Sequence, residues 1–217
     1  MNARDRILAR VRLALDRASE TAQSESAATV RDRLRNRPRG PLPAMNWDLV
    51  PRFRERCFSS SSTVDEIARL DQVPHAVARY LAGNALPSAC VCWPELAPLE
   101  WTAAGLQVEA RPATGDDSTG ISGVFCAIAE TGTLMLLSGA ENYATTSLLP
   151  DTHIAVVPAT RIVRSMEDAW DLLRSERGAL PRQVTFVSGP SRTGDIEMTL
   201  VLGIHGPYRV HVIVVGG

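Results

Sequence analysis

The stretch that decides the fold is residues 153–188, HIAVVPATRIVRSMEDAWDLLRSERGALPRQVTFVS. It starts with an apolar run over 153–157, which Pro158 ends, and this pattern predicts a buried strand. Residues 165–174 then follow the spacing of an amphipathic helix, with an apolar face formed by Met166, Ala169, Trp170 and Leu173. A second apolar run follows over 184–188. Two strands joined by a helix predict a parallel crossover, and therefore a sheet covered by helices on both faces.

The same alternation extends toward both ends of the chain. Before this stretch, the apolar spacing predicts a helix over 65–81, a strand over 88–93, a short helix over 94–104 and a strand over 106–110. After it, a last strand is predicted over 210–215. Strands that alternate with helices predict an α/β fold.

One pair of strands departs from this alternation. The apolar runs 124–129 and 133–137 are separated only by Glu130-Thr131-Gly132. Glycine suits the positive φ of a tight turn, so the spacing predicts a β-hairpin. Because a hairpin pairs antiparallel strands, we expect a mixed sheet.

The N-terminal region has a different composition. Residues 1–18 predict an amphipathic helix rich in arginine, and a basic, proline-containing stretch over 31–39 predicts a linker. We therefore expect an N-terminal helical arm and linker over 1–45, followed by one domain over 46–217. The arginines could contact nucleic acid, but no aromatic side chains lie between them for base stacking. A solvated or partner-docking arm is therefore the favoured interpretation.

The composition limits the classes of function. The chain has 217 residues and a formal net charge of -1, with 45% hydrophobic and 22% charged residues. These values are typical of a globular protein with no general attraction for nucleic acid or anionic membranes. No apolar stretch reaches the roughly 20 residues that cross a bilayer, and the charged N-terminus lacks a secretory pattern. We therefore expect a soluble, cytoplasmic protein without a membrane partner.

The cysteines and histidines do not have the spacing of metal sites. The four cysteines are Cys57, Cys90, Cys92 and Cys126, and no two of them form a C-x-x-C pair. They are predicted to be buried free thiols. The four histidines show no H-x-x-x-H spacing. We expect neither a tightly bound metal nor a cofactor.

The first candidate site is the turn Glu130-Thr131-Gly132-Thr133. A carboxylate held by a tight turn can act as a nucleophile, a base or a hydrogen-bond acceptor. Thr131 and Thr133 add hydroxyl groups. The alternative is an ordinary polar turn that faces water.

The second candidate site follows the strand that ends at Ser188. Glycines allow backbone N–H groups to approach an anion, hydroxyls donate hydrogen bonds, and arginine can bind a carboxylate or phosphate through two N–H groups. The candidate ligand-binding residues are Ser188, Gly189, Ser191, Arg192, Thr193, Asp195 and Glu197. The alternative is a structural loop in which Arg192 pairs with Asp195 or Glu197. Residues 195–202 fit either a helix, whose N-terminus would favour an anion, or a strand.

The third candidate is His205, in the turn Gly203-Ile204-His205-Gly206-Pro207. A histidine can act as an acid or a base near neutral pH. The alternative is a turn histidine that hydrogen-bonds the backbone.

Three long stretches carry a resemblance to a known family. They are GISG…AIAETGTLML, SLLPDTHIAVVPATRIV and FVSGPSRTGDIEMTLVLGIHGPYRVHVIVV, within residues 60–217. Together they resemble the LUD domain of the lactate-utilisation protein C type. The resemblance implies a Rossmann-like α/β core related to the NagB, RpiA and CoA-transferase folds. It also implies a role in oxidising L-lactate to pyruvate beside iron–sulfur partner proteins. Val124-Phe125 stands where family members often have Ala-Asp, which removes a polar group beside Glu130.

Three functions follow from these patterns. The first is an accessory subunit of a lactate-oxidising system that binds a partner and a small carboxylate or phosphate. The second is a stand-alone enzyme on an acyl-CoA, sugar-phosphate or folate-like anion, with Glu130 placed like the nucleophile of CoA transferases and His205 as acid or base. The third, ranked last, is nucleic-acid binding through the arginine-rich arm. The first two predict that Glu130, Arg192 and His205 converge on one hollow.

Overall fold

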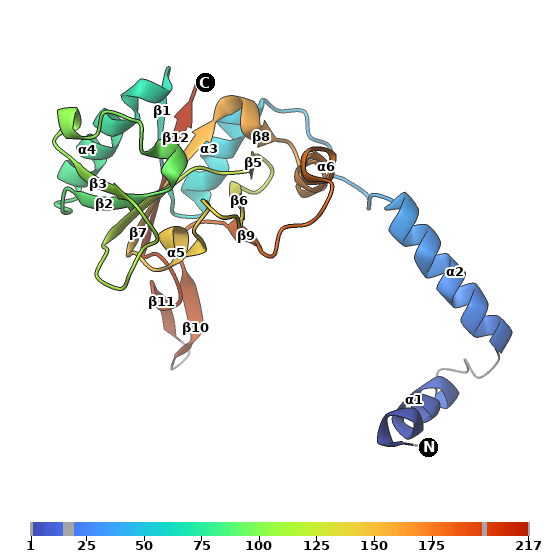
Figure 1. Ribbon diagram of the computed structural model, residues 1–217. Helices are drawn as coiled ribbons and strands as arrows, with labels where there is room; N and C mark the ends of the chain where they lie inside the picture. Colours follow the sequence, from blue (N-terminus) through green and yellow to red (C-terminus); the bar gives the residue numbers. More distant parts are fainter. Residues whose placement is uncertain (1, 15–19, 197–198, 217) are drawn as a thin grey trace. The chain divides into compact units, whose positions relative to one another are not determined.

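The computed structural model describes residues 2–14, 20–196 and 199–216 (Figure 1). The chain divides into two compact units, Met1–Ala44 and Met45–Gly217. The first contains α1 (Ala3–Ala14), which buries no side chain, and α2 (Glu20–Asn36). The prediction of a linker from residue 31 is wrong as far as Asn36, because α2 continues to that residue. Residues 20–36 contain no proline or glycine and many straight-chain residues and alanines, which favour a helix.

The larger unit is built on a six-stranded sheet in which every neighbouring pair is parallel. Its strand order is β1 (Thr63–Ile67), β12 (Arg209–Val215), β7 (Thr152–Pro158), β4 (Thr119–Ser122), β2 (Ala89–Cys92) and β3 (Gln107–Ala110). The central strands β7 and β12 are buried almost along their whole length. This is expected for a parallel sheet covered on both faces.

A second sheet of four strands contains the antiparallel pairing. Its order is β8 (Ile162–Val163), β5 (Cys126–Ile128), β6 (Thr133–Leu137) and β9 (Val184–Val187). The predicted hairpin is confirmed as β5 and β6, whereas β5 and β8 pair in parallel. The predicted parallel crossover from 153–157 to 184–188 is wrong, because β9 does not join β7 in the large sheet but pairs antiparallel with β6 in this one. The mixed α/β fold class is therefore confirmed, with antiparallel pairs in this second sheet and none in the large one.

Helices lie on both faces of the large sheet. Along β7, Ile154 and Val156 pack against α4 (Val73–Gly83), while Ala155 and Val157 share a core with α3 (Leu49–Ser59) and the second sheet. This alternation follows from the two-residue period of a strand. The outer face of the second sheet packs on α6 (Met166–Arg177), and α5 (Ala144–Leu148) contacts β4 and β7.

Several predicted elements differ from the observed ones. Residues 63–67 form the edge strand β1, so the predicted helix from residue 65 is wrong at its start, and α4 begins at Val73 beside Pro74. Proline is tolerated in the first helical turn, which explains this boundary. The predicted helix over 94–104 is two short 3-10 turns, η2 (Pro94–Leu96) and η3 (Thr102–Ala104), because Pro98 interrupts it.

The uncertain segment 195–202 is not helical where it is described. Instead β10 (Arg192–Ile196) and β11 (Thr199–Leu202) form a separate antiparallel hairpin. The alternating apolar residues therefore correctly indicated a strand, and the helix N-terminus considered as the alternative does not exist there. No helix in the described part of the chain is long and apolar enough to cross a membrane.

Candidate functional site

The C-terminal end of α3 is the point where the predicted segments meet. Arg56 Nε donates a hydrogen bond of 3.0 Å to the carbonyl oxygen of Glu130. Gly132 has a φ of 70° and lies directly on the backbone of α3. A Cβ at this position would lie 2.7 Å from Cys57 N. The turn 130–133 is therefore docked on α3 in a way that only glycine permits.

The loop after β9 docks on the same helix end. Gly189 has a φ of 80°, and a Cβ there would overlap the carbonyl oxygen of Ser60. Arg192 donates a hydrogen bond of 2.6 Å from its guanidinium to Ser61 Oγ. Ser61 has a φ of 67°, which is the left-handed conformation typical of the residue after a helix. The end of α3 thus positions both the glycine loop and its arginine.

A chain of hydroxyl groups joins the two docked segments. Thr131 Oγ1 lies 2.7 Å from Thr133 Oγ1, which lies 2.5 Å from Ser188 Oγ. Thr133 is buried, whereas Thr131 is exposed. Pairing of β6 with β9 sets this arrangement, because Leu134 lies opposite Val187. Such a chain leads from solvent to the glycine loop and can offer a hydroxyl hydrogen bond to a ligand.

Loss of the central hydroxyl should be costly. We expect Thr133→Val to destabilise the fold by about 1–3 kcal/mol, since Ser188 and Thr131 then lose their shared partner at a buried position. Thr131→Val is the matched control, because it removes an exposed hydroxyl from the same chain, and it should cost clearly less. Urea unfolding of both variants measures this, and equal costs would contradict the account.

The corner 203–207 also contacts the glycine loop. Ser191 N donates to Pro207 O at 2.9 Å, and Gly203 N donates to Ser191 O at 3.0 Å. A Cβ on Gly206 would lie 3.4 Å from Ser191 Cβ. This contact brings the His205 segment beside the loop, but the His205 side chain itself is exposed and hydrogen-bonds to no described residue.

The remaining predicted residues are placed as follows. Glu130 is held by its backbone, because its N–H donates to Arg164 O and its carbonyl accepts from Arg56, while no described residue pairs with its carboxyl. Thr193 is buried in β10. Arg192 binds Ser61, and the side chain of Asp195 and all of Glu197 lie outside the described residues. Sequence reasoning missed α3, which organises the site.

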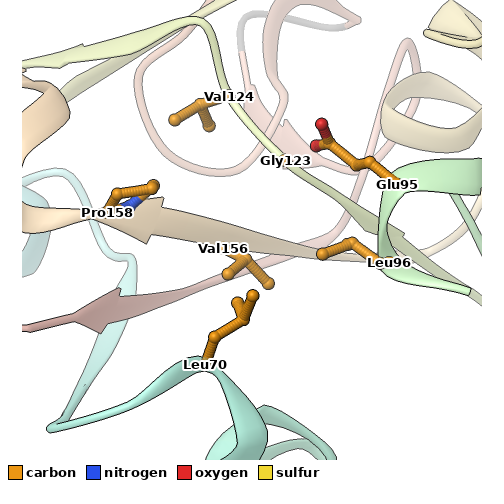
Figure 2. A pocket seen from close by; sticks show the side chains of 7 residues that line it. All are labelled: Leu70, Glu95, Leu96, Gly123, Val124, Val156 and Pro158. Atoms are coloured by element: carbon orange, nitrogen blue, oxygen red, sulfur yellow. The ribbon is translucent and has the colours of Figure 1, made fainter. Parts of the chain in front are cut away.

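A cavity of about 200 Å³ lies at the carboxyl ends of the large sheet's strands. Figure 2 shows the side chains around it, which follow or end β1, β2, β4 and β7: Leu70, Glu95, Leu96, Gly123, Val124, Val156 and Pro158. In the strand order, β2 leads outward to β3, whereas β4 leads in the opposite direction to β7. The gap between β2 and β4 is therefore a topological switch point, where open α/β sheets commonly bind ligands.

The Glu95 carboxyl belongs to this cavity, and sequence reasoning missed it. Its side chain reaches the surface, but apolar neighbours remove part of the carboxyl's hydration, and this desolvation raises its pKa above the ordinary value. No described residue donates a hydrogen bond to it. The sequence signal that pointed to this cavity was the stretch GISG (Gly120–Gly123), which was noted only for the family resemblance and was not predicted to be a strand, although it contains most of β4.

The fold and these sites define an α/β protein of Rossmann-like architecture, in which two loops contact the end of α3 through glycines. Residues 94–215 match the model of the LUD domain, which is more than half of the chain. The chain belongs to the LUD domain family, and the predicted resemblance is confirmed.

Curated relatives carry the same type of name. Lactate utilization protein C of Anoxybacillus flavithermus is 40% identical over 88 residues, which are 41% of this chain and 39% of that protein. Lactate utilization protein C of Bacillus subtilis is 41% identical over 91 residues, 41% of this chain and 38% of that protein. The matched part of the chain thus spans about two fifths of the length of these relatives.

A solved structure supports the fold. The crystal structure of a DUF162 family protein from Deinococcus radiodurans matches with a TM-score of 0.59 and 26% identity. The match covers 80% of this chain and 100% of that one.

Proposed function

We propose that this chain is the LUD-domain subunit of a system that oxidises L-lactate to pyruvate, and that it works with iron–sulfur partner proteins. The observation that carries the proposal is the match to relatives named lactate utilization protein C, at about 40% identity. The family match over 94–215 also includes the turn 130–133, the loop 188–193 and the corner 203–207. The turn and the loop contact the end of α3, and the corner contacts the loop.

The state of the cysteines supports a division of labour with partners. Burial raises the pKa of Cys57, Cys90 and Cys126 to about 12 and that of Cys92 to about 11. Such thiols stay protonated near neutral pH, whereas an iron–sulfur cluster is held by thiolates. In the described part of the chain, no three His, Cys, Asp or Glu side chains are grouped so that they could hold a metal ion. The cysteines of this chain therefore do not fit a cluster, and we assign the clusters to the partners.

The end of α3 is proposed to bind a small carboxylate or phosphate. Arg192 is exposed and fixed through Ser61, and its remaining N–H groups can bind a carboxylate by two hydrogen bonds. Arg56 uses Nε for the Glu130 carbonyl, and no described residue accepts from its other guanidinium nitrogens. These two cations offset the negative end of the helix dipole, which would otherwise disfavour an anion. The hydroxyls of Thr131, Thr133 and Ser188 supply neutral donors nearby.

Removal of the arginine charge should weaken anion binding. We expect Arg192→Gln to bind L-lactate, pyruvate and inorganic phosphate at least about tenfold more weakly, because a charge-assisted hydrogen bond contributes about 1.5–3 kcal/mol. Arg182→Gln is the matched control, since Arg182 is also an exposed arginine but lies before β9. Isothermal titration of each anion measures this. Anion affinity that survives Arg192→Gln would contradict the proposed site.

The biological role has its own test. A strain that lacks this chain should fail to grow on L-lactate while it still grows on pyruvate, and the tagged chain should co-purify with iron–sulfur proteins. Normal growth on L-lactate without the chain would overturn the proposed role.

A second function is favoured by the geometry of Glu130. Its two backbone groups are fixed by Arg164 and Arg56, while its carboxyl has no partner among the described residues. A rigidly presented, unpaired carboxylate suits a nucleophile or base on an acyl-CoA, sugar-phosphate or folate-like substrate. If the chain has such a reaction, Glu130→Gln should abolish turnover, and full activity of this variant would exclude the role.

A further inference from the structure

We propose that the cavity at the carboxyl ends of β1, β2, β4 and β7 binds a small organic cation, with the Glu95 carboxylate as its counter-ion. This site is built from other residues than the anion site at the end of α3, and its proposal goes beyond the lactate-related role.

The lining of the cavity combines an apolar wall with one ionisable group. The apolar wall is formed by Leu70, Leu96, Val124, Val156 and Pro158. Among the described residues that line the cavity, Glu95 alone has a side chain that can carry charge. Leu96 and Val156 are buried, whereas Leu70 and Pro158 are exposed. In Figure 2 the Glu95 side chain extends from η2 toward Gly123, across from Val124.

Gly123 allows the carboxyl to take this position. A Cβ at Gly123 would overlap Glu95 Oε1, although the φ of this glycine is not in the left-handed region. The absence of a side chain at Gly123 is therefore explained by space for the carboxyl and not by backbone conformation. Substitution of this glycine should displace the Glu95 carboxyl without straining the backbone. A Gly123 variant therefore tests the role of the carboxyl's position.

The charge of the cavity selects the class of ligand. An anion such as lactate or phosphate would face an unpaired carboxylate of like charge. A neutral apolar molecule would remove water from the carboxylate without replacing its hydrogen bonds, which is costly. A cation on an apolar body fits the whole lining, because its N–H groups pair with Glu95 and its body contacts the leucines and valines of the wall. A volume of about 200 Å³ is small for a ligand pocket, so a single ring or a short alkyl chain is the expected size.

Benzamidine is a suitable probe, and benzoate is its control with the same ring and the opposite charge. The full chain, labelled with ¹⁵N, is titrated with each compound and followed by NMR. We expect benzamidine to bind with a dissociation constant below about 10 mM and to shift the amide signals around Glu95 and Gly123. Glu95→Gln should weaken this binding at least about tenfold, and Gly123→Ala should weaken it as well. Glu100→Gln, which changes an exposed glutamate nearby, should leave it unchanged.

The outcomes separate this inference from the lactate proposal. Equal binding of benzoate and benzamidine, unchanged benzamidine affinity in Glu95→Gln, or no saturable shift with benzamidine would each overturn the cation site. An unchanged thermal midpoint in Glu95→Gln confirms that the variant is folded. The benzamidine affinity of this variant therefore tests the cation site even if Gly123→Ala does not fold. Arg192→Gln should bind benzamidine normally, so failure of one site leaves the other intact.

Discussion

Gly189→Ala is expected to destabilise the protein by at least about 3 kcal/mol, which is among the largest effects that one methyl group can have. Alanine at a φ of 80° costs about 1–2 kcal/mol by itself. The new Cβ would also overlap the carbonyl oxygen of Ser60, which is backbone and cannot rotate away. The loop would have to leave the end of α3, and Arg192 would then lose its contact with Ser61. Gly132→Ala should behave similarly, because its Cβ would meet the backbone of Arg56 and Cys57.

Gly105 supplies the matched control for this prediction. It has a φ of 76°, but a Cβ there would meet nothing within 4 Å. Gly105→Ala should therefore show only the conformational cost of about 1–2 kcal/mol. Urea unfolding of the three variants separates strain from docking. If all three substitutions reduce the free energy of unfolding by the same amount, the loops are not packed on α3 as described.

Acidification is expected to remove about 4 kcal/mol of stability between about pH 7.5 and about pH 5 through two buried histidines. His153 is fully buried on β7, and burial lowers its pKa from 6.5 to about 4. His211 on β12 has its pKa lowered from 6.5 to about 4 by burial, with Asp65 opposing and Arg79 adding to the shift. One ring nitrogen of His153 is hydrogen-bonded to the Ser122 hydroxyl, and one of His211 to the Thr63 hydroxyl. The other nitrogen of each ring is buried and has no hydrogen-bond partner in the described structure.

The direction follows from proton binding. The unfolded chain takes up a proton at each histidine near pH 6.5, whereas the folded chain does so only near pH 4. The stabilisation is complete above the unfolded pKa and is lost as the pH falls through this window, by about 2 kcal/mol per histidine at pH 5.

The histidine prediction is tested by urea unfolding at both pH values. His153→Gln should flatten the pH dependence by about half, because one of the two titrating groups is removed. His75→Gln is the control, since His75 is exposed, and it should leave the dependence unchanged. An unaltered pH dependence in His153→Gln would show that this histidine does not contribute.

The regular parts of the fold could be predicted from local periodicity. β7, α6 and β9 were recognisable because apolar runs and a helical stripe are separated by clear breakers such as Pro158 and Gly178. β1 was mistaken for a helix because its residues continue without a break into the apolar pattern of α4. β4 was missed because Thr119–Ser122 has few apolar residues, although the sheet buries all four. Tertiary packing, not local preference, decides such segments.

The site could be predicted only in part for the same reason. The glycines at 132 and 189 marked turns, and the structure places both turns on the end of α3. The sequence held no motif for α3 itself, whose Phe53 and Cys57 are buried while Phe58 is exposed beside arginines and a glutamate. Glu95 lies on a single 3-10 turn, and its importance depends on which strands are neighbours. Strand order is a non-local property that residue spacing does not reveal.

The most direct test of the anion site is a ¹⁵N NMR titration of the full chain with L-lactate. We expect saturable shifts concentrated at residues 56–61, 131–133 and 188–192, and we expect them to disappear in Arg192→Gln. Saturable shifts centred on Glu95 and Gly123 instead, or a pattern unchanged by Arg192→Gln, would contradict the anion site.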